Sequence, residues 1–437
     1  MASGSCHRCG HCEKPGAPVR CGQCKASWYC DRDCQRKHWP QHKVACKKSG
    51  TASAATPPAT SVTKAASAET LFSEAAEVPT RGAAGWSHFK IGDQHLLAVA
   101  NFFTSAPGRD PSMETESALY TICNSCSRSL ELKEVQRFRT VGAHGVDHFS
   151  HASQDYIAIP NYYGGDSLVY RWSGTKFEQL QRLVTDGAGS VEAFKIGSQQ
   201  MLGIAEFNIG IAAIYKLEGE YPEERFKMWQ RIKAPGVGAM TTLTVNAEDG
   251  GEQLLLIIAS YVTRQTGWRT RSPIFALNSE GTAFEHHHDV ATVGAHDVEV
   301  VSVNERHFAF FSNDKDERST LQNSELFEWI GNFPAGRLET RQRVETDGAH
   351  AAEFFSSPSG DRQFLAVANL GDRQANRYRR NSLVYELDLS ARKPLKLVQR
   401  LPTLGATDFL GFVIEDTTYL AVSNEQDDDL GGDVKST

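Results

Sequence analysis

The sequence has 437 residues and a formal net charge of −7, with 46 Lys and Arg against 53 Asp and Glu. No apolar stretch approaches about eighteen residues, so the sequence predicts no transmembrane helix. Residues 1–10 lack the apolar segment of a secretory signal. The chain contains 10 cysteines, but seven of them belong to one metal-ligand pattern, which removes the support for a disulfide-bonded secreted protein. We therefore expect a protein of the cytoplasm or the nucleus, not a secreted one, with reduced thiols.

Seven cysteines and one histidine form four short pairs in the first fifty residues. Thiolate and imidazole ligands in groups of four are what Zn²⁺ selects, and a site with four protein ligands holds a shape and leaves no position for a reactive water. We therefore predict two structural zinc ions per chain. The pairs are Cys9 with Cys12, Cys21 with Cys24, Cys30 with Cys34, and His42 with Cys46.

The order of the four pairs leaves two ways to divide the ligands. In a cross-brace, the first and third pairs hold one zinc and the second and fourth pairs hold the other. In a sequential arrangement, the first two pairs hold one zinc and the last two hold the other, and spacing alone leaves this alternative open. The segment is too short to bury a core of its own, so zinc binding supplies much of its folding free energy, about 10–16 kcal/mol per structural zinc at neutral pH.

The spacing C-x2-C-x8-C-x2-C-x5-C-x3-C-x7-H-x3-C, with Trp28-Tyr29 before the fifth ligand and Trp39 before the histidine, resembles that of a MYND-type zinc finger. The resemblance implies a cross-braced fold and a protein-interaction module that binds short proline-containing peptides. In that family a glutamine and a tryptophan line the peptide site, and the corresponding residues here are Gln35 and Trp39. The alternative for Trp39 is a core residue packed against the zinc site.

Composition separates the finger from the rest of the chain. Residues 1–50 carry ten Lys and Arg and three Asp and Glu, a charge that favours an acidic partner, but they do not interleave base-stacking aromatic residues as nucleic-acid modules do. A segment rich in Ala, Ser, Thr and Pro follows and is typical of a flexible tether. We therefore predict a finger over residues 6–48, a linker over 49–68 and a main domain over 69–437. The cysteines outside the pattern, Cys6, Cys123 and Cys126, are expected to be free thiols.

A phrase of eight residues, Gly-Ala-x-x-Val-Asp/Glu-x-Phe, recurs through the main domain every 45 to 60 residues. An apolar run ending in a small polar residue, a Ser-x-x-Tyr/Phe element and a Gln-Arg pair follow in most copies. Copies close to the full phrase begin at Gly142, Gly187, Gly294 and Gly348, and weaker copies begin at Gly82, Gly238 and Gly405.

Each copy holds four short β-type segments separated by turn residues and no amphipathic helix of useful length, which is typical of a propeller blade. We therefore predict a mainly β fold: a seven-bladed β-propeller preceded by a small two-zinc cross-brace finger. The last copy lacks an obvious Ser-x-x-Tyr strand. Closure of the ring is expected from the C-terminal tail or from the segment near Leu71 to Val78.

The repeat resembles the EAR, or EPTP, repeat, whose blades combine the same Gly-Ala, Leu-Ala-Val-Ala-Asn and Ser-x-x-Tyr elements. The resemblance implies a propeller that binds partner proteins. The best-known members are extracellular, whereas the finger here requires reduced thiols. We therefore expect this propeller to share the interaction role of the family but not the extracellular partners of its best-known members.

Polar residues recur at fixed places in the phrase. They are the carboxylates Asp147, Glu192, Glu299 and Glu353 and the histidines His144, His296 and His350. Rings of such groups could bind a cation or a basic peptide, but we expect them to satisfy backbone groups between blades, because catalysis needs an asymmetric pair. None of the common catalytic motifs appears in the sequence.

These observations predict no enzyme activity and no catalytic residues. We expect a protein-interaction adaptor whose finger captures a short proline-containing peptide and whose propeller offers a second surface. The expected partners are proteins or peptides, not nucleic acid or membranes. The alternative is a propeller hydrolase or lyase that uses the finger for docking.

Overall fold

The computed structural model describes residues 9, 11–12, 19–21, 27–45, 71–105, 110–124, 130–427 and 435–437. The chain separates into two compact units, one that contains the finger and one that contains most of the β-strands. The predicted linker and the cysteines at positions 6 and 126 lie outside the described residues. The predicted domain boundaries therefore stay predictions.

The described part of the finger contains two short strands and one helix. β1 (Val19–Arg20) pairs antiparallel with β2 (Trp28–Tyr29), and α1 (Arg32–Ala45) follows. Asp31 caps this helix, because its Oδ1 accepts a hydrogen bond of 2.7 Å from the backbone N–H of Cys34. The cap fixes the first turn of α1 and with it the position of a predicted metal ligand.

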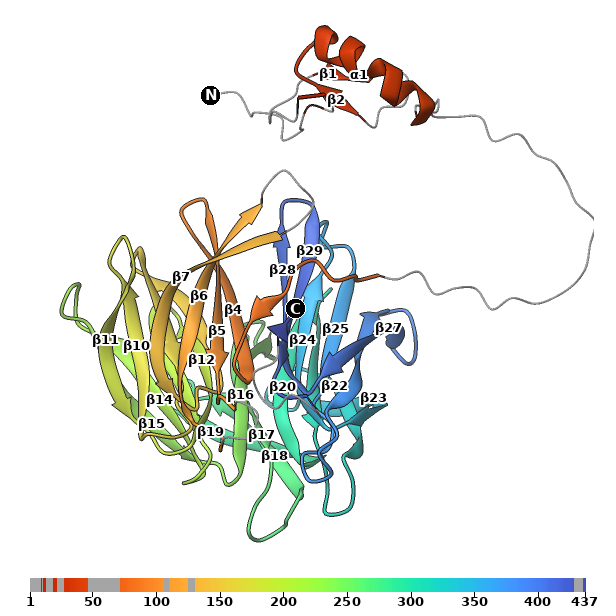
Figure 1. Ribbon diagram of the computed structural model, residues 1–437. Coiled ribbons are helices and arrows are strands. Elements are labelled where there is room, and N and C mark those ends of the chain that lie inside the picture. The colour runs from red at the N-terminus through yellow and green to blue at the C-terminus, as the bar shows by residue number, and fades with distance from the viewer. Residues whose placement is uncertain are drawn as a thin grey trace, which may run out of the picture. The chain divides into compact units, whose positions relative to one another are not determined.

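Six four-stranded antiparallel sheets form the blades of a β-propeller (Figure 1). Blade one contains β4 (Ala83–Ile91), β5 (Gln94–Asn101), β6 (Glu114–Asn124) and β7 (Leu130–Val141). Blade two contains β8 (Asp147–His151), β9 (Gln154–Ile159), β10 (Asp166–Trp172) and β11 (Phe177–Val184). Blade three contains β12 (Ala188–Ile196), β13 (Gln199–Glu206), β14 (Ile211–Glu218) and β15 (Arg225–Lys233).

The other three blades have the same order of strands. Blade four contains β16 (Val237–Asn246), β17 (Glu252–Ser260), β18 (Arg269–Leu277) and β19 (Phe284–Val293). Blade five contains β20 (Ala295–Val303), β21 (Arg306–Asn313), β22 (Leu321–Ile330) and β23 (Arg337–Asp347). Blade six contains β24 (Ala349–Ser356), β25 (Gln363–Asn369), β26 (Arg379–Leu387) and β27 (Leu395–Leu404).

The first strand of each blade lies innermost. These strands and β28 (Ala406–Ile414) form a closed ring in which each contacts the next, with β28 between β24 and β4. β28 pairs with β29 (Thr417–Asn424) in a sheet of only two strands. The prediction of seven blades is therefore wrong in number, because the structure has six four-stranded blades and the seventh copy of the repeat forms a two-stranded sheet.

The seventh copy is short because no Ser-x-x-Tyr segment follows Asn424, and two other segments lie in its place. β30 (Lys435–Ser436) pairs with β3 (Val78–Pro79), so the first and last strands of the propeller lie side by side (Figure 1, orange and blue). The hydroxyl of Ser436 accepts a hydrogen bond of 3.0 Å from the backbone N–H of Asn424 and lies 2.8 Å from the hydroxyl of Thr80. Both segments named by the sequence analysis thus take part in closure.

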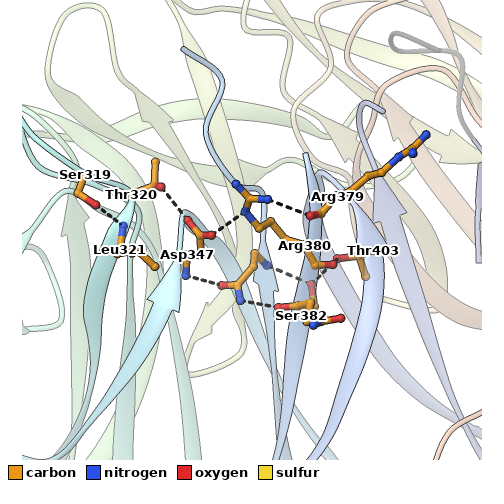
Figure 2. Close-up of polar contacts among 10 residues, drawn as sticks. Ser319, Thr320, Leu321, Asp347, Arg379, Arg380, Ser382 and Thr403 are labelled. Atoms are coloured by element: carbon orange, nitrogen blue, oxygen red, sulfur yellow. Dashed lines mark hydrogen bonds and ion pairs between the residues drawn. The ribbon is translucent and has the colours of Figure 1, made fainter. Parts of the chain in front are cut away.

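Figure 2 shows the corresponding polar network in blade six and the adjoining part of blade five. The hydroxyl of Ser382 accepts a hydrogen bond of 3.1 Å from the backbone N–H of Asn369 and lies 2.8 Å from the hydroxyl of Thr403. The side chain of Asn369 accepts from the backbone N–H of Asp347 at 3.2 Å and donates to the carbonyl of Asn381 at 2.8 Å. The repeated Ser, Asn and Thr therefore satisfy buried polar groups where neighbouring strands meet.

A glycine with positive φ precedes each innermost strand. The φ angles lie between +53° and +75° at Gly82, Gly142, Gly187, Gly236, Gly294, Gly348 and Gly405. At Gly294 an added Cβ would overlap the carbonyl oxygen of Lys315, so both the backbone angle and the available space require glycine. The fourth copy of the phrase begins at Gly236 and not at the predicted Gly238, which lies inside β16.

The hydrophobic core lies between neighbouring blades. Phe310 of blade five and Leu365 of blade six belong to one buried cluster. Phe364 of blade six and Phe409 of β28 belong to another, so the two-stranded sheet packs like a blade. Because the apolar side chains fill the spaces between blades, polar groups of the innermost strands can line a central cavity.

Candidate functional site

Four cysteines of the finger come together although they are distant in sequence. The Sγ atoms of Cys9, Cys12, Cys30 and Cys34 all lie within 4.8 Å of one another. The Sγ of Cys12 is 3.5 Å from that of Cys30 and 3.9 Å from that of Cys34. Four sulfurs at about 2.3 Å from a tetrahedral zinc are about 3.8 Å apart, so these residues fit Zn²⁺. The first and third pairs share one site, as in a cross-brace.

The crowding of sulfur atoms has an electrostatic consequence. The pKa of the Cys30 thiol is raised to about 11, first by its hydrogen bond with Cys12 and then by burial. A bound divalent cation reverses this effect, because it stabilises thiolates directly. Tyr29 is fully buried against Cys9 and Cys21, so the core of the finger is built around its cysteines.

The second predicted ligand set is only partly described. Cys21 and His42 are both buried, whereas Cys24 and Cys46 lie outside the described residues. Nδ1 of His42 lies 3.4 Å from the hydroxyl of Ser27. The second zinc stays a prediction.

Gln35 and Trp39 are four residues apart on α1, so their side chains share one face of the helix. Trp39 is 39% exposed and stands outside the buried cluster around Tyr29. Its ring centroid lies 5.8 Å from that of His42, which anchors one side of the indole. This exposure favours a surface role over the alternative of a core residue.

The propeller carries a central cavity of about 390 Å³. Its wall contains all the repeated polar residues singled out by the sequence, namely Asp147, Glu192, Glu299, Glu353, His144, His296 and His350. Oδ2 of Asp147 accepts a hydrogen bond of 2.8 Å from the backbone N–H of Ala193, and Oε1 of Glu353 accepts one of 3.3 Å from that of Gly411. In both cases the donor belongs to the next innermost strand, so these carboxylates join neighbouring strands of the ring.

Two further carboxylates line the same cavity and were missed by the sequence analysis. Asp297 accepts a hydrogen bond of 3.0 Å from the backbone N–H of Ala352, and Asp408 accepts one of 3.1 Å from that of Trp86. Both occupy the fourth place of the phrase, where the other copies have Gly, Ala or Ser. The acidic residue at the fourth place of these two copies was the signal in the sequence that could have identified Asp297 and Asp408.

Burial raises the pKa of these carboxyl groups. The pKa of Asp147 is raised to about 6, and that of Asp408 to about 8, in both cases mainly because the charged form is desolvated. The pKa of Glu192 is raised to about 8 by burial and by the charge of Asp147. Glu192 and Asp408 are therefore protonated more readily than an exposed carboxyl group, whereas the backbone hydrogen bonds that these groups accept act in the opposite direction.

The fold and the metal site define a zinc finger followed by a repeat propeller, and the family models agree with this class. The MYND finger model matches residues 6–46, and the EPTP domain model matches residues 71–112 and 131–173. The chain thus carries a MYND finger followed by EPTP repeats, as both resemblances implied.

Each of the two relatives below shares either the finger or the propeller repeats with this chain. The human thrombospondin-type laminin G domain and EAR repeat-containing protein is 29% identical over 151 residues, which cover 34% of this chain and 21% of that protein. The zinc finger MYND domain-containing protein 10 homolog of Drosophila melanogaster is 50% identical over 42 residues, which cover 10% of this chain and 9% of that protein. The chain thus spans about a fifth or less of the length of these relatives.

Solved propeller structures resemble this chain at low identity. The periplasmic gluconolactonase of Pseudomonas aeruginosa is 15% identical, with a TM-score of 0.49, over 78% of this chain and 88% of that chain. The hydrazine synthase of Kuenenia stuttgartiensis is 11% identical, with a TM-score of 0.44, over 80% of this chain and 98% of that chain. At these values the likeness carries no argument about activity.

Among the described residues, no helix combines the length and the apolar character needed to cross a bilayer.

Proposed function

We propose that this chain is a non-catalytic protein-interaction adaptor whose finger binds a short proline-containing peptide. The observation that carries the proposal is the exposed indole of Trp39 beside Gln35 on α1. These residues stand where MYND fingers line their peptide site. An aromatic face that is rigid and partly open to solvent suits a proline ring, because it offers apolar area at little cost in side-chain entropy.

Zinc holds this surface in place. One Zn²⁺ bound by the four clustered cysteines fixes the start of α1 through Cys34, and a second would hold the later part of the helix through His42. Both sites need thiolates, so a reducing compartment, the cytoplasm or the nucleus, suits the protein.

The propeller supplies a second binding surface in this proposal. Residues 49–68 are rich in Ala, Ser, Thr and Pro and would join the two parts as a tether. A short flexible tether raises the effective concentration of the second site to about the millimolar range, so joint affinity can exceed that of either site alone. Weak contacts at both surfaces would then be enough for stable capture of one partner.

The non-catalytic part of the proposal rests on the cavity. Asp147, Glu353, Asp297 and Asp408 each accept a hydrogen bond from the next innermost strand. A carboxylate that is used in this way holds the ring together, and the same arrangement recurs around the cavity.

A quantitative pull-down from a reduced extract tests the proposal. It compares the intact chain, Trp39→Ala and Tyr221→Ala, the last being a matched control on the propeller because Tyr221 is 62% exposed. We expect Trp39→Ala to lose partners that contain proline-rich segments and Tyr221→Ala to keep them, with equal zinc content in all three proteins. If Trp39→Ala retains its zinc and still binds the same partners, the proposed peptide site is wrong.

A second arm tests the non-catalytic claim on the same preparations. The intact chain is screened for turnover of small metabolites, with Asp147→Asn and Glu353→Gln as a pair of repeat counterparts. We expect no turnover. A turnover that one substitution abolishes and the other leaves intact would establish an enzyme instead.

A further inference from the structure

Three histidines from different blades meet in the wall of the central cavity. His144 precedes β8, His296 lies in β20 and His350 lies in β24. Their candidate ligand nitrogens all lie within 4.8 Å of one another. The ring centroids of His296 and His350 are 3.7 Å apart, and that of His144 is 5.4 Å from that of His350. Only closure of the ring brings these residues together.

Backbone carbonyls fix the tautomers of these imidazoles. Nδ1 of His296 lies 3.0 Å from the carbonyl oxygen of His350, and Nδ1 of His350 lies 2.9 Å from that of Thr407. A carbonyl oxygen can only accept, so Nδ1 carries the proton in both rings and Nε2 presents a lone pair. His144 forms a hydrogen bond with the backbone of Gly189, the residue at the same place in the next copy.

One of these lone pairs has no protein partner. His350 is 2% exposed, and its Nε2 is buried without a hydrogen bond among the described residues. A buried polar atom left in this state is costly, and such an atom commonly marks the place of a water or an ion. One nitrogen of each ring lies within 4.8 Å of those of the other two, and a single ion bound between the rings would give the unpaired Nε2 of His350 a partner.

Burial and the nearby positive charge of Arg373 favour the neutral form of the three rings. Burial lowers the pKa of His144 to about 4 and lowers those of the other two well below the usual value, with further contributions from the neighbouring imidazoles and Arg373. Arg373 forms an ion pair of 2.7 Å with Glu425, which offsets its charge. Lys315 lowers the pKa of His296 further, and Asp314 accepts a hydrogen bond of 2.7 Å from the hydroxyl of Tyr261, whose ring centroid lies 5.0 Å from that of His296.

We propose that His144, His296 and His350 bind one divalent transition-metal ion through their Nε2 atoms, with Zn²⁺ as the first candidate. Ligating histidines in proteins donate their other ring N–H to a carbonyl or carboxylate, which is the arrangement seen here. A triangle with sides of 4.8 Å has its centre about 2.8 Å from each corner, so a contraction of about 0.7 Å reaches the Zn–N distance.

The site leaves room for a further ligand. The third place of the phrase is Ala84, Gly189 and Gly238 in three of the other copies, so small residues lie beside the trio in the cavity wall. A water or a small anion can therefore complete a tetrahedral shell from the cavity side. This site is independent of the finger and of its peptide.

Zinc content of the full chain tests the proposal. His350→Gln and His144→Gln are loaded with Zn²⁺ and dialysed beside the unchanged chain; a glutamine amide at position 350 can still donate to the carbonyl of Thr407 but supplies no imidazole nitrogen. His148→Gln is the matched control, because His148 lines the same cavity and bonds to Asp155 at 3.1 Å outside the trio. We expect the unchanged chain and His148→Gln to hold one zinc more than the two trio variants.

A second readout separates ligation from folding. The urea midpoint of the propeller is followed by the protease resistance of residues 130–427, so that zinc binding to the finger does not contribute. Added Zn²⁺ is expected to raise this midpoint in the unchanged chain and His148→Gln but not in the trio variants. Equal zinc content in the unchanged chain and both trio variants would overturn the proposal. Loss of the same zinc from His148→Gln would also overturn it, because the metal would then depend on the shape of the cavity and not on the three ligands.

Discussion

Substitution of Ser436 by alanine tests how the ring of blades closes. Ser436 is fully buried, and its hydroxyl accepts from the backbone N–H of Asn424 at 3.0 Å and lies 2.8 Å from the hydroxyl of Thr80. Alanine leaves the buried N–H of Asn424 without this acceptor, which costs about 1–3 kcal/mol, and removes a hydroxyl pair that contributes about 1 kcal/mol. We expect Ser436→Ala to lower the free energy of unfolding by about 2–4 kcal/mol.

Blade six supplies the matched control for this substitution. Ser382 makes the same two contacts, with Asn369 at 3.1 Å and with Thr403 at 2.8 Å, inside a complete four-stranded sheet. Urea unfolding of the full chain, followed by tryptophan fluorescence, should give losses for Ser436→Ala and Ser382→Ala that agree within about 1 kcal/mol. A loss below about 0.5 kcal/mol for Ser436→Ala beside a full loss for Ser382→Ala would refute closure by β30.

Three further predictions concern the finger and the cavity. Chelation of zinc should unfold the finger and expose residues 6–46 to limited proteolysis while residues 130–427 stay resistant, because metal binding supplies the folding free energy of the finger; a finger that stays protected would contradict this. Cys30→Ser should have the same effect without a chelator, as measured by zinc content and proteolysis. The pKa of Glu192, raised from 4.5 to about 8, means that the folded state binds the proton more tightly. Its stabilising contribution is thus complete at low pH and is lost as the pH rises toward about 8. Glu192→Gln should therefore flatten the decline in unfolding free energy between about pH 5 and pH 9, and an unchanged decline would count against the buried proton.

The parts of the fold with local signals could be predicted from the sequence. The pairs that begin with Cys9 and Cys30 specify a metal site through short spacings, and the structure brings both pairs together. The glycine before each innermost strand recurs because the turn needs positive φ, so it marks the start of each blade. Repetition also identified Asp147 and Glu353 as residues that join strands.

The parts that depend on long-range geometry could not be predicted in the same way. Ser436 belongs to a strand of two residues and contacts Thr80, which lies 356 positions away in sequence. Nothing local marks such a strand, so the number of complete blades was overestimated. The convergence of His144, His296 and His350 likewise depends on the diameter of the closed ring, and the sequence shows only that they share one place in the phrase.

The affinity of the finger for a proline-containing peptide is the measurement that tests the proposed function most directly. A labelled peptide, selected by probing a proline-containing peptide array with the intact chain, is titrated by fluorescence anisotropy against the intact chain, Trp39→Ala and Tyr221→Ala. We expect Trp39→Ala to bind at least about tenfold more weakly, a loss of about 1.4 kcal/mol or more, with zinc content unchanged and Tyr221→Ala unaffected. Affinities within about twofold of each other for all three proteins would contradict the account.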